Sequence, residues 1–177
     1  MLRRNPLMEK INITFQPLTE EYLPLLTEWL NRPHMQLWWR NEKTDINKVR
    51  EKYIPRIFDT DTAKPFLFFI NEIPYGYIQY YSISNGNPNW WPDKPGEGVF
   101  GSDQFIADEE NLNKGIGTKM ITEFIIYLQK IVDVKEVRVD PSPTNLRAIK
   151  CYEKVGFVNK GLIENPDGKA FMMVLKL

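Results

Sequence analysis

The first third of the chain combines one alternating segment with an amphipathic pattern of helical period. Residues 11–15 alternate between apolar and polar side chains and predict a first β-strand. Beyond them, Thr19 and the two glutamates that follow can open a helix to about Asn31, and Pro33 is expected to end it. The apolar residues of this segment recur at spacings of three and four and predict one buried stripe: Tyr22, Leu25, Leu26, Trp29 and Leu30.

A second helix is predicted from Asp45 to about Phe58. Its apolar positions again share one face: Ile46, Val49, Tyr53 and Ile57. Pro55 is expected to kink or shorten this helix, because proline has no N–H and clashes with the preceding turn.

The middle of the chain changes to a β pattern. Residues 66–70 and 75–83 are aromatic and β-branched runs separated by a short turn, which is typical of a hairpin. Residues 84–98 concentrate turn-forming residues, with several Gly, Pro and Asn flanking Trp90 and Trp91, and they predict an ordered surface loop anchored by these tryptophans.

The remaining third alternates strands and helices. The pattern predicts strands at 99–107 and 134–139, helices at 120–131 and from Thr144 or Asn145 to about Val155, and two terminal strands that begin at Phe157 and turn at 165–168. At 177 residues the chain has room for one well-buried core, so residues 1–177 are expected to form a single α/β domain.

Composition excludes several classes of function. Lys+Arg and Asp+Glu both total 23, so the chain lacks the net positive charge of a nucleic-acid binder. No segment approaches the roughly 20 apolar residues that span a bilayer, and we expect a cytoplasmic protein without membrane contact. Cys151 and His34 are single residues of their kinds and cannot form the usual multi-ligand zinc site, so no metal is expected.

A glycine-rich turn lies between the strand at 99–107 and the helix after it. Gly115 and Gly117 let the backbone approach a phosphate closely, and the N–H groups of the first helical turn can bind anionic oxygens. Taken alone, a turn that only lets the strand pack on its helix explains the segment equally well.

About thirty residues later, Asn145 and Tyr152 stand seven positions apart, which places both on one helical face. A tyrosine in this position could protonate a leaving thiolate. The succession of strand, G-x-G turn, helix, strand and the pattern N-x-x-A-x-x-x-Y-x-x-x-G-F resembles the GNAT acetyltransferase superfamily.

This resemblance implies a mixed central β-sheet that splays between two central strands, with helices on both faces, and acetyl-CoA as co-substrate. Pantetheine would lie along the strand that ends at residues 105–107, pyrophosphate on the turn, and Tyr152 would be the general acid. The implied acetyl-CoA contacts are Phe105, Ile106, Ala107, Asn113, Lys114, Gly115, Ile116, Gly117, Thr118, Lys119 and Asn145. The chain departs from the family at Leu112, where Gln or Arg is usual, which affects one side-chain contact.

Within this superfamily, three longer segments are similar to the aminoglycoside 6′-N-acetyltransferases: residues 28–39, 101–108 and 140–152. In that family acidic groups bind a small polycationic aminosugar, and the matching carboxylates here are Asp103 and Asp140. An ammonium group must lose its proton before it attacks a thioester, so we assign Asp103 as the base. Asp140 would hold the amine and neighbouring ammonium groups by charge-assisted hydrogen bonds.

The resemblance also places Trp39 and Tyr53 in the substrate wall, whereas Trp38 fits a helical cap equally well. Cys151 is expected in the core and His34 in a structural role. Two other functions remain open at this point: acylation of a lysine or hydroxylamine side amine in siderophore synthesis, and a non-catalytic CoA-binding module. Either a monomer or a homodimer is compatible with the sequence.

Overall fold

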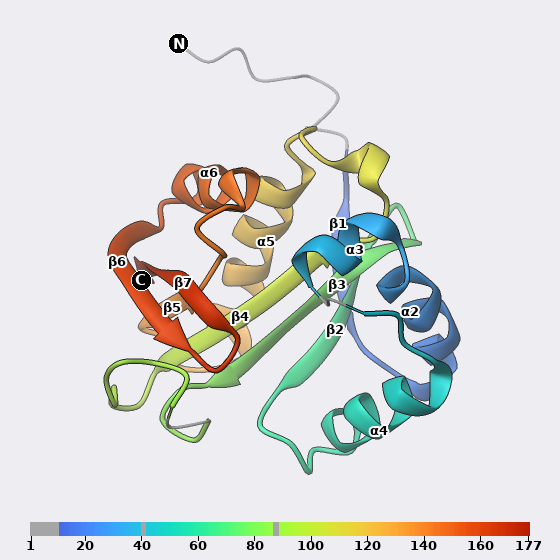
Figure 1. Ribbon diagram of the computed structural model, residues 1–177, viewed down its shortest axis with the longest axis horizontal. Coiled ribbons are helices and arrows are strands. Elements are labelled where there is room, and N and C mark those ends of the chain that lie inside the picture. The colour runs from blue at the N-terminus through green and yellow to red at the C-terminus, as the bar shows by residue number, and fades with distance from the viewer. Residues whose placement is uncertain (1–10, 40–41, 87–88) are drawn as a thin grey trace.

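The computed structural model describes residues 11–39, 42–86 and 89–177. Within these ranges seven strands form one mixed sheet in the order β1-β2-β3-β4-β5-β7-β6 (Figure 1). The strands are β1 (Ile13–Pro17), β2 (Lys64–Ile70), β3 (Ile73–Ser82), β4 (Val99–Ile106), β5 (Glu136–Val139), β6 (Val158–Asn165) and β7 (Gly168–Lys176). Neighbouring strands run antiparallel except β4 and β5, which are parallel.

Five α-helices and two 3-10 turns complete the described part of the chain. They are η1 (Glu20–Tyr22), α2 (Leu23–Leu30), α3 (Pro33–Trp38), α4 (Ile46–Ile57), η2 (Glu109–Asn111), α5 (Ile116–Ile131) and α6 (Leu146–Val155). Asp45 caps α4 by accepting the backbone N–H groups of Asn47 and Lys48, and Asn145 caps α6 by accepting that of Ala148. In the described ranges, no helix combines the length and apolar character that crossing a membrane requires.

Two predictions about the first two helices were wrong in detail, whereas the predicted end of the first helix near Asn31 was confirmed. The helix expected to open at Thr19 is a 3-10 turn followed by α2, and the Thr19 side chain makes no capping hydrogen bond. Pro33 occupies the first turn of the additional helix α3, where its missing N–H costs nothing. Pro55 lies inside α4, which nevertheless continues to Ile57, because proline removes only the one backbone bond that its own N–H would donate.

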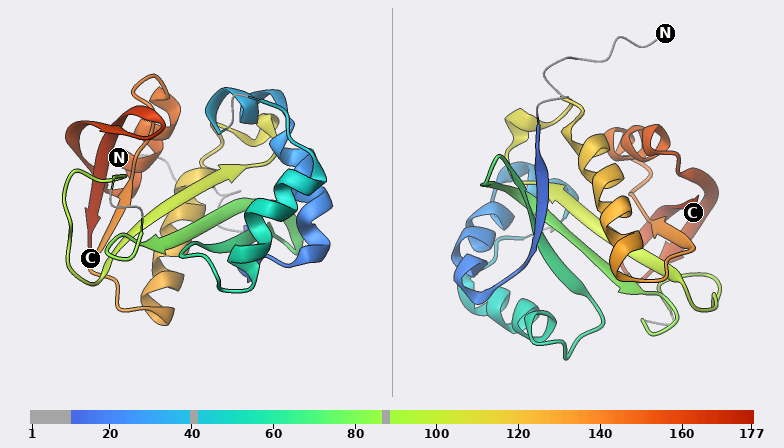
Figure 2. Two further views of the ribbon diagram at one scale, coloured as in Figure 1. Left: turned by 60° about the horizontal axis from the view of Figure 1, so that its bottom comes forward. Right: turned by 180° about the vertical axis from the view of Figure 1, so that it is seen from behind.

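Two apolar cores lie on opposite faces of the sheet. On one face, α5 and α6 cover β2, β3 and β4 through residues such as Phe68, Ile78 and Phe124. On the other face, α2, α3 and α4 pack on Leu67, Tyr77 and the neighbouring residues of the same strands. Figure 2 shows these two groups of helices from two further directions. Because side chains of a strand point alternately to its two faces, successive residues of β4 pack into different cores.

The sheet opens between β4 and β5. In the described structure these strands pair over three positions, Val99–Gly101 with Glu136–Arg138. β4 then continues to Ile106, whereas β5 ends at Val139 and is followed by Asp140 and Pro141. The second half of β4 therefore presents a free edge toward the gap, as the resemblance to the GNAT fold implied.

A close approach of backbone to glycine in β3 yields a stability prediction. A Cβ at Gly76 would stand 2.2 Å from the Phe105 carbonyl oxygen, and backbone cannot move aside cheaply. We expect Gly76→Ala to lower the free energy of unfolding in urea by about 2–4 kcal/mol. Gly96→Ala is the matched control, since no atom lies within 4 Å of its added Cβ; equal effects of the two changes would contradict the prediction.

Candidate active site

A cavity of about 1500 Å³ occupies the gap between β4 and β5. This volume exceeds the roughly 300–1,000 Å³ of a pocket for one small ligand, so there is room for two molecules side by side. Its walls include eleven of the residues predicted from the sequence: Trp39, Asp103, Phe105, Ile106, Asn113, Gly115, Gly117, Thr118, Asp140, Asn145 and Tyr152. Five others, Tyr53, Ala107, Lys114, Ile116 and Lys119, lie outside the lining.

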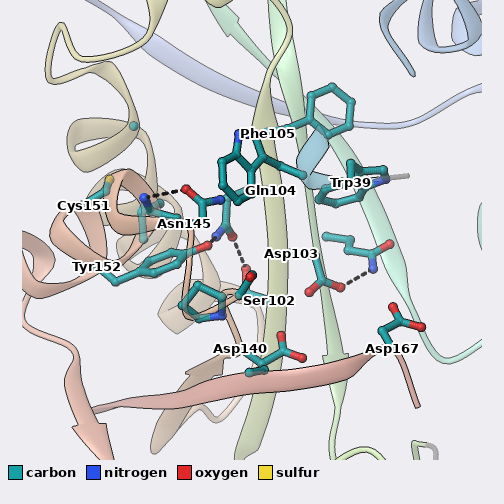
Figure 3. A pocket seen from close by; sticks show the side chains of 18 of the residues that line it. Trp39, Ser102, Asp103, Gln104, Phe105, Asp140, Asn145, Cys151, Tyr152 and Asp167 are labelled. Carbon is teal, nitrogen blue, oxygen red and sulfur yellow. Dashed lines mark hydrogen bonds between the residues drawn. The ribbon is translucent and has the colours of Figure 1, made fainter. Parts of the chain in front are cut away.

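Tyr152 projects from α6 to one side of β4 (Figure 3). Its hydroxyl accepts a hydrogen bond from the Gln104 Nε2, and the Gln104 Oε1 accepts one from the Ser102 hydroxyl at 2.9 Å. Because the phenol oxygen accepts this bond, its own proton remains free to point into the cavity. Burial raises the pKa of Tyr152 well above its ordinary value, so the side chain carries its proton at neutral pH.

Asp103 projects to the opposite side of β4, because it precedes Gln104 in an extended strand (Figure 3). Its Oδ2 accepts a 2.6 Å hydrogen bond from the Nε2 of Gln79, the residue paired with it on β3. The Gln79 Oε1 in turn accepts from the Tyr77 hydroxyl at 2.6 Å and from Arg56 Nη1 at 2.8 Å. These two donors fix the orientation of the amide, so its nitrogen always faces the carboxylate.

Asp140 lies where β5 ends, at the lower end of the same cavity (Figure 3). Its Oδ2 accepts hydrogen bonds from the Trp90 indole N–H at 2.8 Å and from the Asn165 Nδ2 at 2.9 Å. Two elements distant in sequence, the loop at 84–98 and the turn between β6 and β7, therefore meet at this carboxylate.

Burial raises the pKa of both carboxyl groups. Desolvation is the main cause for Asp103, where the Gln79 hydrogen bond acts in the opposite direction. For Asp140, desolvation and the negative charge of Asp103 raise the pKa to about 7. Asp167, on the β6–β7 turn, raises the pKa of both further through its charge. A polycationic ligand would relieve this repulsion, so the cavity favours ammonium groups.

The turn before α5 fits the phosphate groups of a nucleotide co-substrate. Gly115 and Asn113 both adopt positive φ, at 84° and 61°. The first backbone bond of α5 runs from the Lys119 N–H to the Gly115 carbonyl, which leaves the N–H groups of the three preceding residues directed out of the helix end. A Cβ at Gly117 would stand 3.2 Å from the Cys151 sulfur, so glycine also permits close packing of α5 on α6.

Aromatic rings form part of the substrate side. The Trp39 ring contacts Phe105 edge-to-face at a centroid distance of 5.0 Å and Tyr77 at 6.0 Å, while it lines the cavity. Tyr53 is fully buried beneath this layer and packs on Tyr77 at 5.6 Å. Tyr53 thus supports the wall from behind instead of presenting its ring to the cavity.

Sequence reasoning missed three partners of the predicted residues. Gln79 donates to Asp103, the proposed base, and Gln104 donates to Tyr152, the proposed acid. Trp90 donates to Asp140 in addition to anchoring its loop. One signal for Gln79 is present in the sequence, since it is an amide within an otherwise aromatic and aliphatic strand. The contact to Asp103 depends on strand register, which the sequence does not contain.

Comparison with known proteins agrees with this architecture. A family model described as an acetyltransferase (GNAT) domain matches residues 19–165. The chain therefore belongs to the GNAT acetyltransferase family, and the predicted fold class is confirmed.

Several individual proteins are similar to this chain over much of its length. The aminoglycoside N(6′)-acetyltransferase type 1 of Klebsiella pneumoniae is 38% identical over 165 residues, which are 92% of this chain and 82% of the relative. A kanamycin resistance protein of Rhizobium radiobacter is 45% identical over 85 residues, 48% of this chain and 79% of the relative. The crystal structure of AAC(6′)-Ib with coenzyme A and kanamycin matches with a TM-score of 0.87 at 38% identity, covering 93% of this chain and 95% of that one.

The raised pKa of Asp140 predicts that this residue destabilises the fold at neutral pH. Its ordinary value of 3.8 applies to the unfolded chain, so ionising it costs more in the folded protein and stability is lost as pH rises toward 7. Asp140→Asn keeps an oxygen acceptor for Trp90 and Asn165 but never ionises. We expect this variant to be more stable than the parent by about 1–3 kcal/mol above pH 7.

Urea denaturation at several pH values measures this difference. The advantage of the variant should shrink as pH falls toward about 4, where the carboxyl group is protonated in both states. A constant difference between pH 5 and pH 8, or a less stable variant at pH 8, would contradict the assignment.

Proposed function

We propose that this protein transfers the acetyl group of acetyl-CoA to the 6′-amine of aminoglycoside antibiotics. One observation carries the proposal: two half-buried carboxyl groups with raised pKa values and a protonated tyrosine border a single cavity beside a helix N-terminus. The relatives named above support it, because they are named for aminoglycoside N(6′)-acetylation and for kanamycin resistance. Since acetyl-CoA is an intracellular metabolite, we also propose that the protein acts in the cytoplasm.

In this mechanism Asp103 takes the proton from the substrate ammonium group, directly or through a water molecule. The raised pKa of its carboxyl group makes it a stronger base than an exposed aspartate. Asp140 binds the reacting amine or a neighbouring ammonium group, and its attraction to a cation strengthens in the low-dielectric cavity. The neutral amine then attacks the thioester carbon, so the C–N bond forms and the C–S bond breaks. The acylated nitrogen releases its second proton to water in the cavity, the departing thiolate takes the proton of Tyr152, and the tyrosine oxygen recovers a proton from that water.

Tyr152 is the proposed proton donor to the departing thiolate. Its hydroxyl oxygen is held by Gln104, its proton is free, and it stands on the side of β4 that faces the α5 and α6 helices. The turn before α5 would bind pyrophosphate, and the free edge of β4 offers backbone groups to pantetheine. Holding amine and thioester together can itself supply roughly 7–11 kcal/mol of the barrier, so no acetyl-enzyme is needed.

The proposal is tested by following thiol release from acetyl-CoA with purified protein. Kanamycin, tobramycin, amikacin, gentamicin and free lysine form the substrate panel, and mass spectrometry locates the acetyl group on the product. Turnover on substrates with a 6′-amine supports the assignment. Turnover on lysine alone, or acetyl-CoA binding without turnover on any amine, would overturn the proposed substrate.

Removing the proposed base should affect turnover more than binding. We expect Asp103→Asn, which keeps the shape and the Gln79 contact, to lower kcat about 10²–10⁴-fold in the thiol-release assay. Glu97→Gln, a change at an exposed carboxylate on the loop, should leave kcat near that of the parent. Full turnover by Asp103→Asn would remove Asp103 from the mechanism.

The pH dependence of kcat/KM should report Asp140. Its pKa near 7 means that a growing fraction of the carboxyl group is neutral below this pH and cannot bind an ammonium group. We therefore expect kcat/KM for kanamycin to fall as pH decreases below about 7. In Asp140→Asn this decrease of kcat/KM at acidic pH should disappear or move to another pH. An unchanged decrease in the variant would show that another group is responsible.

A further inference from the structure

The loop that carries Trp90 is held to β5 by one buried cation. Only 7% of the Arg138 side chain is exposed, and its Nη1 and Nη2 donate to the two carboxylate oxygens of Asp93 at 2.5 and 3.0 Å. Its Nε donates to Glu136 Oε1 at 2.7 Å. This two-bond geometry between guanidinium and carboxylate fixes orientation as well as distance.

A tryptophan adds a second contact to the same guanidinium. The Trp91 side chain is buried, with 5% exposure, and its ring lies 5.7 Å from the Arg138 Cζ. Residues 91 and 93 of the loop are therefore both fastened to Arg138. Trp90 precedes them directly, and its indole N–H reaches Asp140.

Strand geometry links the two ends of this arrangement. Arg138 lies in β5, and Asp140 directly follows the last residue of that strand, two positions further along the chain. The loop segment 90–93 is thus fastened at both residues, to Arg138 by an ion pair and a ring contact and to Asp140 by a hydrogen bond. Arg138 donates its hydrogen bonds to Asp93, Glu136 and the Met172 sulfur, so we argue that its influence on Asp140 passes through the loop.

We propose that Arg138 and Asp93 form a clamp that positions Trp90 against Asp140 and thereby sets the affinity for the ammonium groups of the substrate. This inference rests on the proposed function. Both clamp residues are positioning residues, since neither needs to touch the reacting atoms. The clamp acts on the aminosugar side of the cavity and leaves the turn before α5, where acetyl-CoA would bind, unaffected.

Asp93→Ala is the variant of choice. The Asp93 side chain is 52% exposed, and Arg138 keeps Glu136 as its partner, so the change leaves no buried charge without a counter-ion. Asp133→Ala is the control, because Asp133 is an exposed carboxylate, paired with Lys135 at 3.8 Å, beside the foot of the same loop. We expect Asp93→Ala to raise KM for kanamycin about fivefold to twentyfold, with kcat and KM for acetyl-CoA within about twofold of the parent.

A double-mutant cycle tests whether the effect passes through Trp90. In a Trp90→Phe background, which already lacks the hydrogen bond to Asp140, Asp93→Ala should change KM less than about twofold. If Asp93→Ala raises KM equally in both backgrounds, or no more than Asp133→Ala does, the clamp does not act by positioning Trp90 and the inference is overturned.

A measurement without substrate separates this inference from the proposed function. In the NMR spectrum of the free protein, the Trp90 indole N–H should be protected from solvent exchange, and Asp93→Ala should reduce that protection about tenfold or more. Unchanged protection would overturn the clamp even if kanamycin is acetylated. Absence of aminoglycoside turnover in the parent would instead overturn the proposed function, while the exchange data would still decide whether the clamp exists.

Discussion

The short pairing of β4 with β5 is the constraint on which the rest of the site depends. Backbone hydrogen bonds join the two strands over three positions, and then β5 ends before Pro141 while β4 continues. Had the ladder continued, the edge of β4 would be filled by its neighbour and no cavity could exist there. The stability of the sheet comes instead from its antiparallel pairs and from the two cores, which hold the separated strands in place.

Alternation along β4 then distributes the proposed chemistry between two faces. Asp103 and Gln104 are consecutive, so the carboxylate faces the α2–α4 side while the amide that holds Tyr152 faces the α5–α6 side. Proton removal from the amine and proton delivery to the sulfur are thereby assigned to opposite sides of one strand. The distance between Asp103 and the Tyr152–Gln104 pair therefore depends mainly on the backbone of β4. This backbone is paired with β3.

Local patterns predicted most elements, whereas contacts between elements were harder to predict. The apolar periodicity located α2, α4 and the β2–β3 hairpin, whereas α5 begins at Ile116, within the G-x-G turn and before the predicted start at Met120. Helix α3 was missed because Pro33 both terminates one helix and initiates the next. The partners of Asp103 and Asp140 could not be predicted, because they follow from strand register and from the path of a long loop. Only family resemblance placed both carboxylates in one cavity.

The fixed amide of Gln79 has a consequence for where protons can go. Arg56 and Tyr77 both donate to its oxygen and its nitrogen donates to Asp103, so every hydrogen in this chain points toward the carboxylate. This series of hydrogen bonds can stabilise the negative charge of Asp103, but it cannot accept a proton from the Asp103 carboxyl group, because no lone pair faces that group. A proton captured by this residue must therefore leave by way of the cavity, with water or with the departing product. The Gln79 network behind Asp103 therefore stabilises the carboxylate but offers no route for proton transfer into the interior.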